Sequence, residues 1–298
     1  MQLTDYAARD DAIACGTYSP VRKLAGLSEQ LFGRYWRDVH GPLCARLPGL
    51  GYHVQTHFSR ERRANLWPVA GGVRRIEADF DGAVELGFAS VADQSRFDAA
   101  APLLYHQERE LFAWSGAYSL PGGSRTYIDT QADAACNGPD RLHRLHLYLQ
   151  GRSAREFRAW ISDWAAELAQ MDAVRKLRLH LPEPYDNRHP QPPSPGVDHQ
   201  MPANLGQPAI MEIAFDNALA AGHFFHSKPY LATVPWQSAH IAALAAFLVD
   251  AVHTYVRGGE LTMAGLRGSS AAALIADMGA VHQSDPRVTS LFHQMRQA

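Results

Sequence analysis

The chain has 298 residues, of which 46% are hydrophobic and 19% are charged, and its formal net charge is −2. This composition is typical of a globular protein and excludes wholesale disorder. The basic residues are scattered, so we expect no nucleic-acid partner, because binding phosphate backbones needs a concentrated basic surface.

In chain order, the hydrophobic pattern predicts two successive β-α-β-β-α-β units. The first unit has strands near 11–18, 51–58, 82–89 and 117–128, with helices near 28–40 and 92–114. The second has strands near 142–150, 174–181, 209–216 and 251–264, with helices near 153–170 and 219–248. Helices near 269–282 and 286–296 follow. The predicted domains are therefore residues 1–130, residues 140–268 and a helical tail at 269–298.

The two units also resemble each other in sequence. Residues 28–44 match residues 153–169 at an offset of 125, and both segments start with a serine suited to an N-cap. The strand VELGFAS, which contains Glu85, matches MEIAFDN, which contains Glu212, at an offset of 127. The glycine pair at 122–123 resembles the pair at 258–259 at an offset of 136. Matches in the same order indicate an internal duplication.

Membrane insertion and export are not expected. The first twenty residues lack an apolar stretch, and the longest apolar run, Ile241 to Val249, is too short to span a bilayer. The three cysteines are widely spaced and form no CxxC pair. We therefore expect a cytoplasmic protein.

A long loop interrupts the second unit. The segment from Pro182 to Pro208 is rich in proline and has no hydrophobic period, so it cannot be a helix or a central strand. It is either a surface excursion or a lid over a pocket.

The stretch LSEQLFGRYWRDVHGPLCARLPGLGYHVQTHF, at residues 27–58, resembles the opening of an EthD-type protein. The Trp-Arg-x-x-His-Gly-Pro phrase, followed by Leu-Pro-Gly-Leu and a strand, carries the resemblance. The resemblance implies an α+β fold in which two tandem ferredoxin-like repeats form an intramolecular dimeric-type α/β barrel. It also implies a small aromatic or polyketide-like substrate, and a further homodimer is expected for such a fold. The second repeat departs from the motif, because Ala165, Ala166 and Glu167 match His40, Gly41 and Pro42.

Alternation along the strands predicts one apolar and one polar face in each sheet. In the first repeat the polar face of the strand near 51–58 carries His53, Gln55 and His57. Polar positions elsewhere, each opposite apolar neighbours, are Glu85, Arg144, His146, Tyr148, Lys176, Arg178, His180, Glu212, His253 and Tyr255. The polar faces either meet solvent or, if the sheets pair as the resemblance implies, form an enclosed pocket suited to proton transfer.

His40 has two interpretations. Gly41 and Pro42 follow it, which is ordinary helix-stop chemistry, so His40 is either a helix C-terminal cap or an imidazole that acts as general acid or base. The EthD resemblance favours the second interpretation.

Our leading hypothesis is a cofactor-independent lyase, a decarboxylase or retro-aldol enzyme, or a related cyclase or isomerase, acting on an aromatic, phenolic or polyketide-like compound. His40 or His57 would move the proton, and Asp38 or Glu85 would assist. The expected substrate-binding residues are Tyr35, His53, Gln55, Trp67, Arg144, His146, Tyr148, His180, Glu212, His253 and Tyr255.

Two other hypotheses stay open. No HExxH motif, zinc-type spacing or phosphate loop occurs, so we expect neither a metal nor another cofactor. The fifteen histidines nevertheless suggest a haem- or metal-dependent oxidoreductase or monooxygenase as one alternative. A non-catalytic small-molecule binding protein is the other.

Overall fold

A computed structural model describes residues 6–60, 66–131, 135–186 and 194–292. The first repeat and the helix before it comprise α1 (Tyr6–Asp11), β1 (Cys15–Lys23), α2 (Glu29–Tyr35), η1 (Trp36–His40), α3 (Gly41–Ala45), β2 (Leu50–Phe58), β3 (Arg74–Arg75), β4 (Gly82–Phe88), α4 (Val91–Ala100), η2 (Ala101–Leu104), α5 (Tyr105–Leu111), β5 (Phe112–Ser115), β6 (Tyr118–Pro121) and β7 (Arg125–Asp129).

The second repeat comprises β8 (Asn137–Pro139), β9 (His143–Gly151), α6 (Ala154–Ala169), β10 (Lys176–His180), β11 (Glu183–Pro184), η3 (Ala203–Leu205), β12 (Ala209–Phe215), α7 (Ala218–Phe225), α8 (Lys228–His240), β13 (Ile241–Arg257) and β14 (Glu260–Leu261). The C-terminal segment adds α9 (Met263–Arg267), α10 (Ser269–Asp277), η4 (Val281–Ser284), α11 (Pro286–Thr289) and η5 (Ser290–Phe292). The end of the helix predicted near 286–296 lies outside the described residues.

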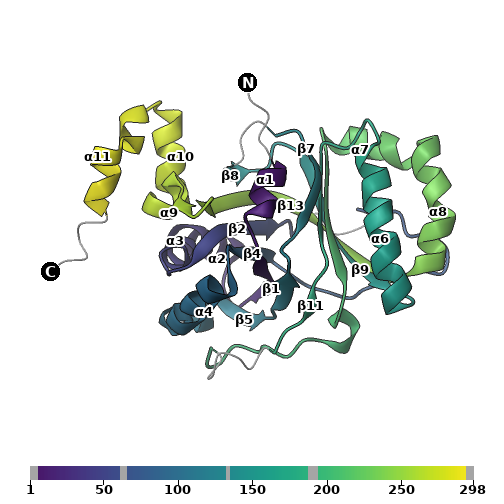
Figure 1. Ribbon diagram of the computed structural model, residues 1–298, viewed down its shortest axis with the longest axis horizontal. Helices are drawn as coiled ribbons and strands as arrows, with labels where there is room; N and C mark the ends of the chain where they lie inside the picture. Colours follow the sequence, from purple (N-terminus) through teal and green to yellow (C-terminus); the bar gives the residue numbers. More distant parts are fainter. Residues whose placement is uncertain (1–5, 61–65, 132–134, 187–193, 293–298) are drawn as a thin grey trace.

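Each repeat forms an antiparallel sheet with the ferredoxin-like strand order. The first sheet runs β6-β1-β4-β2 and the second runs β13-β9-β12-β10, so in each the fourth strand lies beside the first. Helices α2 to α5 cover the outer side of the first sheet, and α6, α7 and α8 cover that of the second (Figure 1). This confirms the predicted fold class of two tandem ferredoxin-like repeats.

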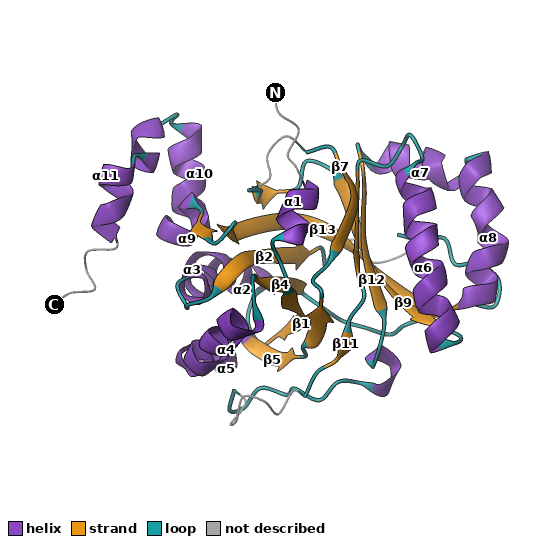
Figure 2. Cartoon of the chain, in the orientation of Figure 1, coloured by secondary structure: helices purple, strands orange, loops and turns teal. Residues whose placement is uncertain are grey.

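Two segments cross from one sheet to the other and join them into a barrel: the long strand β13, and the run of short strands β5, β6 and β7 (Figure 2). The first half of β13 pairs with β9, and its second half pairs with β2 of the other repeat. In the same way β5 and β6 pair with β1, and β7 continues onto β10 of the second repeat. The barrel is therefore closed at both seams, with the helices outside it.

The structure corrects the prediction for β13. The sequence predicts a helix near 219–248, but α8 ends at His240. The apolar run from Ile241 to Val249 forms the first half of β13. Ala245 and Phe247 pack in the barrel core, whereas Leu244 and Leu248 pack beneath the helices. A strand buried on both faces loses the alternation that identifies strands in a sequence.

The two glycine pairs are not structurally equivalent either. Gly258 and Gly259, with φ of +58° and +79°, form the two-residue turn of the β13–β14 hairpin. Gly122 and Gly123, with φ of +79° and +70°, lie between β6, which pairs with β1, and β7, which pairs with β10. Their similarity reflects a shared need for positive φ.

The proline-rich loop packs against one end of the barrel. Leu205 is buried in the barrel core, and its carbonyl accepts a hydrogen bond of 2.5 Å from the Tyr118 hydroxyl. Trp114 Nε1 donates to Gln200 O at 3.0 Å. The described part of the loop therefore covers this end, and residues 187–193 lie outside the described residues. None of the helices in the described part of the chain has the length and apolar character needed to cross a bilayer.

Candidate functional site

The EthD-type motif forms a π-helical turn. Residues Trp36 to His40 are π-helical, and Gly41 N donates to Trp36 O, five residues back. The chain then continues directly into α3, with Gly41 in the right-handed helical region at φ −56°. His40 is therefore not a C-terminal cap, and that interpretation is wrong. The stop signal failed because the wider turn accommodates Pro42 as the start of another helical segment.

Side chains from both repeats satisfy the carbonyls of this turn. Pro42 has no N–H, and the Tyr255 hydroxyl donates to Arg37 O at 2.9 Å. Gln55 Nε2 donates to Trp36 O at 3.3 Å. These contacts place the motif against the seam between β2 and β13, so the second repeat contributes to the site.

We define the histidine cluster as Trp36, His40, His53, Gln55, His57, His253 and Tyr255, which lie between this helical segment and the outer sheet face. The rings of Trp36 and His57 have centroids 4.3 Å apart. His57 and His253 are 4.9 Å apart and nearly perpendicular. His53 is 4.9 Å from Tyr255. The rings of Trp36, His57, His253, Tyr255 and His53 therefore contact one another in series.

The imidazoles of the cluster are neutral at physiological pH. Burial lowers the pKa of His40 to about 4 and, with the nearby His40, the pKa of His53 to about 3. Burial, together with Arg37, lowers the pKa of His253 to about 4. Burial and His253 hold the pKa of His57 well below its usual value. A neutral imidazole carries a free lone pair, so each is a potential base.

His57 is the histidine of the cluster best placed to meet a substrate. It is partly exposed, whereas His40 and His253 are 6% and 3% exposed. Its Nε2 lies 3.5 Å from Gln55 Oε1, at the limit of a hydrogen bond, and Gln55 Oε1 also lies 3.0 Å from the Tyr255 hydroxyl. This contact favours the Nε2–H tautomer and leaves Nδ1 as the basic atom. A Cβ on Gly33 would lie 3.9 Å from His57 Nδ1, an ordinary van der Waals distance, so Gly33 is a close neighbour of that atom.

A second polar group lies inside the barrel and joins the repeats. Arg178 Nη2 donates to Glu85 Oε1 at 2.7 Å, and Ser124 Oγ donates to the same oxygen at 2.9 Å. His180 Nδ1 lies 2.7 Å from Ser124 Oγ, and its Nε2 lies 3.1 Å from Glu212 Oε1. Glu85 comes from the first repeat, and Arg178, His180 and Glu212 come from the second. We call the whole group the barrel network.

Tyrosines and a second histidine extend the network. His146 Nδ1 lies 3.0 Å from the Tyr18 hydroxyl, which lies 3.1 Å from that of Tyr148. His146 Nε2 is 3.6 Å from Glu212 Oε2. Although burial favours a neutral acid, His146 and His180 hold the pKa of Glu212 well below its usual value. Burial raises the pKa of Tyr18 and Tyr148 well above their usual values.

Within the described residues, the barrel network is tightly packed and the cavity beside it is small. The cavity found beside Arg144, Arg178 and Glu212 measures about 20 Å³, which suits one water molecule. The expectation of an enclosed catalytic chamber formed by the two polar faces is therefore wrong. The network acts instead as a buried ionic connection between the repeats.

A metal ion fits the barrel network poorly. Ligand atoms of Glu85, His180 and Glu212 lie within 4.8 Å of one another, a grouping that the sequence spacing did not reveal. However, Arg178 and Ser124 already donate to Glu85. The small cavity is also lined by Arg9, Arg144, Lys176 and Arg178. A further cation would face these positive charges, so the donors suit ion pairs better than a metal.

The predicted site residues divide between these two groups. The histidine cluster contains His40, His53, Gln55, His57, His253 and Tyr255, and the barrel network contains Glu85, Arg144, His146, Tyr148, His180 and Glu212. They cannot act on one substrate, because they lie on opposite faces of the sheets. A single interior surface carrying the polar positions of both repeats was predicted, and this is incorrect for the residues of the histidine cluster, which lie on the outer face.

Three predicted residues belong to neither group. Trp67, an expected substrate-binding residue, is instead fully buried in the core among Trp164, Phe225 and other rings of the second repeat. Asp38 accepts hydrogen bonds from Ser270 N and Oγ at 2.7 and 2.8 Å, which anchors α10. Tyr35 packs at the edge of the core beneath α2.

Some members of both groups were not among the predicted site residues. Trp36 belongs to the histidine cluster, and its position in the Trp-Arg-x-x-His-Gly-Pro phrase was an available signal. Tyr18, Ser124 and Arg178 belong to the barrel network. Arg178 lies on a polar strand face that was recognised, but nothing in the sequence shows its partner Glu85.

Comparisons with known proteins give one family model and several solved structures. The EthD domain model matches residues 24–108, which include Trp36, His40, His53 and His57. A candidate monooxygenase from Fusobacterium nucleatum has 7% identity and a TM-score of 0.49, over 83% of this chain and 96% of that chain. A candidate monooxygenase from Lactobacillus acidophilus has 8% identity and a TM-score of 0.42, over 81% and 96%. An anthrone oxidase-like protein has 11% identity and a TM-score of 0.46, over 83% and 93%.

Among curated protein sequences, none matches the chain significantly. The similarity to the EthD family therefore lies in residues 24–108, which make up most of the first repeat.

Proposed function

We propose that the chain is an enzyme that removes a proton from an enolisable or phenolic small molecule at the histidine cluster, with His57 Nδ1 as the base. The observation that carries this proposal is a partly exposed imidazole, kept neutral by burial and by His253. Gln55 orients it through Nε2. A positioned general base of this kind contributes roughly 10²- to 10⁴-fold to a rate.

The resulting anion reacts, in our proposal, with dioxygen. A CH₂ carbon next to an aromatic ketone loses both hydrogens and becomes a carbonyl. Dioxygen is reduced, so that one of its oxygen atoms ends in the carbonyl and the other in water. This step needs an electron-rich anion and dioxygen as the co-reactant, and it needs no charged anchor for the substrate.

C–C cleavage, the reaction favoured by the sequence analysis, is our second candidate. Decarboxylation requires a cation to hold the substrate carboxylate. The guanidinium that acts on His57 and His253 is that of Arg37, which is already bonded to Asp38 and Ser270. For this reason we place oxygenation ahead of C–C cleavage.

The test measures proton removal and dioxygen uptake separately. Purified protein is mixed with an anthrone or a phenolic ketone in deuterated buffer, and NMR measures exchange of the acidic C–H while an oxygen electrode measures dioxygen uptake. We expect both signals, and a roughly 10²-fold or larger loss of both in His57→Asn. His106→Asn, at an exposed position, is the matched control.

The outcomes separate the hypotheses. Exchange without dioxygen uptake, with release of carbon dioxide or a cleaved carbonyl product, favours the lyase. Haem absorbance, or activity that appears only after a metal is added, favours the cofactor-dependent alternative. Unchanged exchange in His57→Asn contradicts the proposal.

A further inference from the structure

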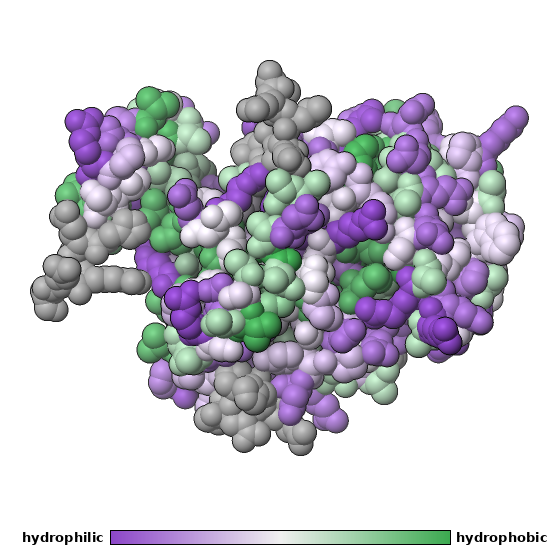
Figure 3. All heavy atoms as spheres, viewed as in Figure 1, coloured by the Kyte–Doolittle hydropathy of each residue, from purple (hydrophilic) through white to green (hydrophobic). Residues whose placement is uncertain are grey.

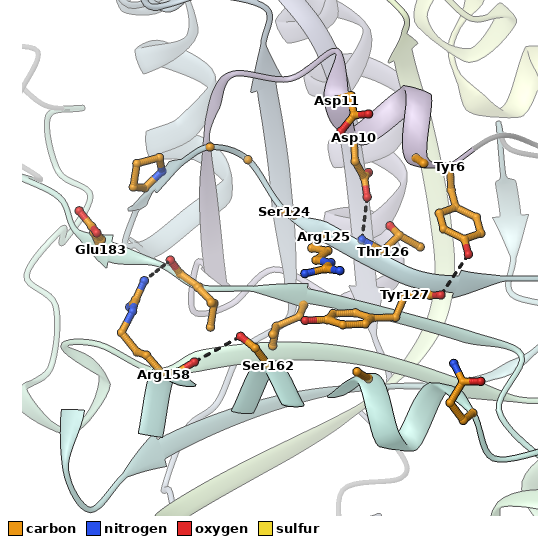
Figure 4. Close-up of a pocket in the computed structure, with 18 residues that line it drawn as sticks. Tyr6, Asp10, Asp11, Ser124, Arg125, Thr126, Tyr127, Arg158, Ser162 and Glu183 are labelled. Atoms are coloured by element: carbon orange, nitrogen blue, oxygen red, sulfur yellow. Dashed lines mark hydrogen bonds between the residues drawn. The ribbon is translucent and has the colours of Figure 1, made fainter. Parts of the chain in front are cut away.

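The second repeat has an open cleft on its helix side, of about 930 Å³. Helix α6 and strands β7 and β10 form its walls, and α1 lies across it (Figure 4). Tyr6 of α1 donates a hydrogen bond of 3.0 Å from its hydroxyl to Tyr127 O.

Strand register makes this cleft the counterpart of the histidine cluster. Glu85 pairs with Val54 of β2, and its repeat partner Glu212 pairs with Arg178 of β10. It follows that His53, Gln55 and His57 correspond to Leu177, Leu179 and Leu181. The second repeat therefore has the same location without the imidazoles.

The crossing strands extend the correspondence. Gln55 pairs with His253, and Leu179 pairs with Arg125. Tyr255 lies at a register shift in β13, and Tyr127 lies at a register shift in β7. Each seam thus presents a bulged tyrosine to the helix side, beside a histidine in the first repeat and an arginine in the second.

One residue distinguishes the two locations. A Cβ on Gly41 would lie 2.4 Å from the Tyr255 ring, so the glycine allows the helix to rest directly on the tyrosine. Ala166 matches Gly41 and lines the cleft together with Tyr127. Because alanine has a Cβ, such an approach is excluded, and α6 stays farther from the sheet.

The lining combines two leucines with an exposed cation, and it also contains the carboxylates of Asp10, Asp11 and Glu183, of which Asp10 is paired with Arg178. Leu179 and Leu181 form an apolar wall where the first repeat has Gln55 and His57. The Arg125 guanidinium lies 4.8 Å from the centroid of the Tyr127 ring, and Figure 4 shows Arg125 above that ring. Arg125 is exposed, and no carboxylate within the described ranges pairs with it.

We propose that this cleft is a binding site for a flat aromatic acid. The rings would lie against Leu179 and Leu181, and the carboxylate would pair with Arg125. Arg158, which also lines the cleft, donates to Leu181 O and Pro182 O at 2.8 Å and holds the edge of the wall in place. The site binds without turning over its ligand, because it lacks the imidazoles of the first repeat. It stands independently of the reaction proposed above.

Titration of the full chain with 2-naphthoate and its neutral counterpart 2-naphthamide tests this proposal. We expect naphthoate to bind more tightly, and Arg125→Gln to weaken naphthoate binding roughly ten- to a hundredfold with little effect on the amide. Ala166→Phe should abolish binding of both probes by filling the cleft. Ala159→Phe, at an exposed position on the same helix, is the matched control.

Binding should be unaltered in His57→Asn, so this test does not depend on catalysis. Equal affinity for the two probes, or naphthoate binding that Arg125→Gln leaves unchanged, overturns the proposal. So does naphthoate binding that is lost in His57→Asn and retained in Arg125→Gln.

Discussion

Acidification should destabilise the protein through the buried imidazoles of the histidine cluster. The pKa values of His40, His53 and His253 are lowered from 6.5 to about 4, 3 and 4. The unfolded chain therefore binds protons below about pH 6.5 that the folded chain does not, so stability falls as pH falls from about 6.5 toward these values.

The magnitude follows from the shifts. Acidification from about pH 6.5 to about pH 5, a change of about 1.5 pH units, lowers the free energy of unfolding by about 2 kcal/mol for each of these imidazoles. The three groups together lose on the order of 6 kcal/mol. Burial raises the pKa of Glu108 to about 7, so protonation of this carboxyl stabilises the folded protein on acidification. Because Glu108 is partly exposed, it offsets at most about 2 kcal/mol, and the net loss is about 4 kcal/mol.

Urea unfolding at about pH 7.5 and about pH 5 measures this loss by linear extrapolation. The variant His53→Leu installs the residue found at the matching position of the second repeat, Leu177. It removes an imidazole that is 1% exposed and whose Nδ1 has no hydrogen-bond partner among the described residues. The loss on acidification should shrink by about 2 kcal/mol, with stability at about pH 7.5 maintained or raised.

His106→Leu, at an exposed position, should leave the pH dependence unchanged. A loss on acidification that is identical in the native protein and in His53→Leu would refute the reasoning. It would show that this imidazole is protonated, or reaches water, in the folded state.

Three further predictions concern a buried ion pair, helix packing and the surface of the C-terminal segment. Glu85→Gln should cost about 1–3 kcal/mol of unfolding free energy, because the buried Arg178 then keeps Asp10 as its carboxylate partner but loses the charged partner Glu85. Glu85→Gln with Arg178→Met should cost less than the two single variants added together, and additivity in urea unfolding would contradict this. Gly41→Ala should cost about 1–3 kcal/mol by displacing the Tyr255 ring, and a melting temperature equal to that of the native protein would count against it. The C-terminal segment projects from the barrel (Figure 1), and hydrophobic side chains lie on its surface (Figure 3). Met278 is one of them and is 74% exposed, so we propose that this segment contributes to the expected homodimer. Met278→Glu should lower the mass measured by light scattering, and an unaltered dimer would exclude this surface.

The sequence by itself determined the architecture. Serine N-caps, amphipathic helices and alternating strands recur in the same order in both halves, and these are local properties. The motif around Trp36 and His40 identified the EthD domain for the same reason. Strand β13 escaped this logic, because burial on both faces removes alternation from its sequence.

Only the tertiary structure decided which face of each sheet lies inside the barrel and which lies beneath the helices. Alternation shows that His53 and His57 share a face, as do Arg178 and His180, but it does not show which face meets the helices. The barrel places the first pair outside and the second pair inside. Contacts such as Arg178 with Glu85 join residues far apart in the chain, so only the closed barrel brings them together.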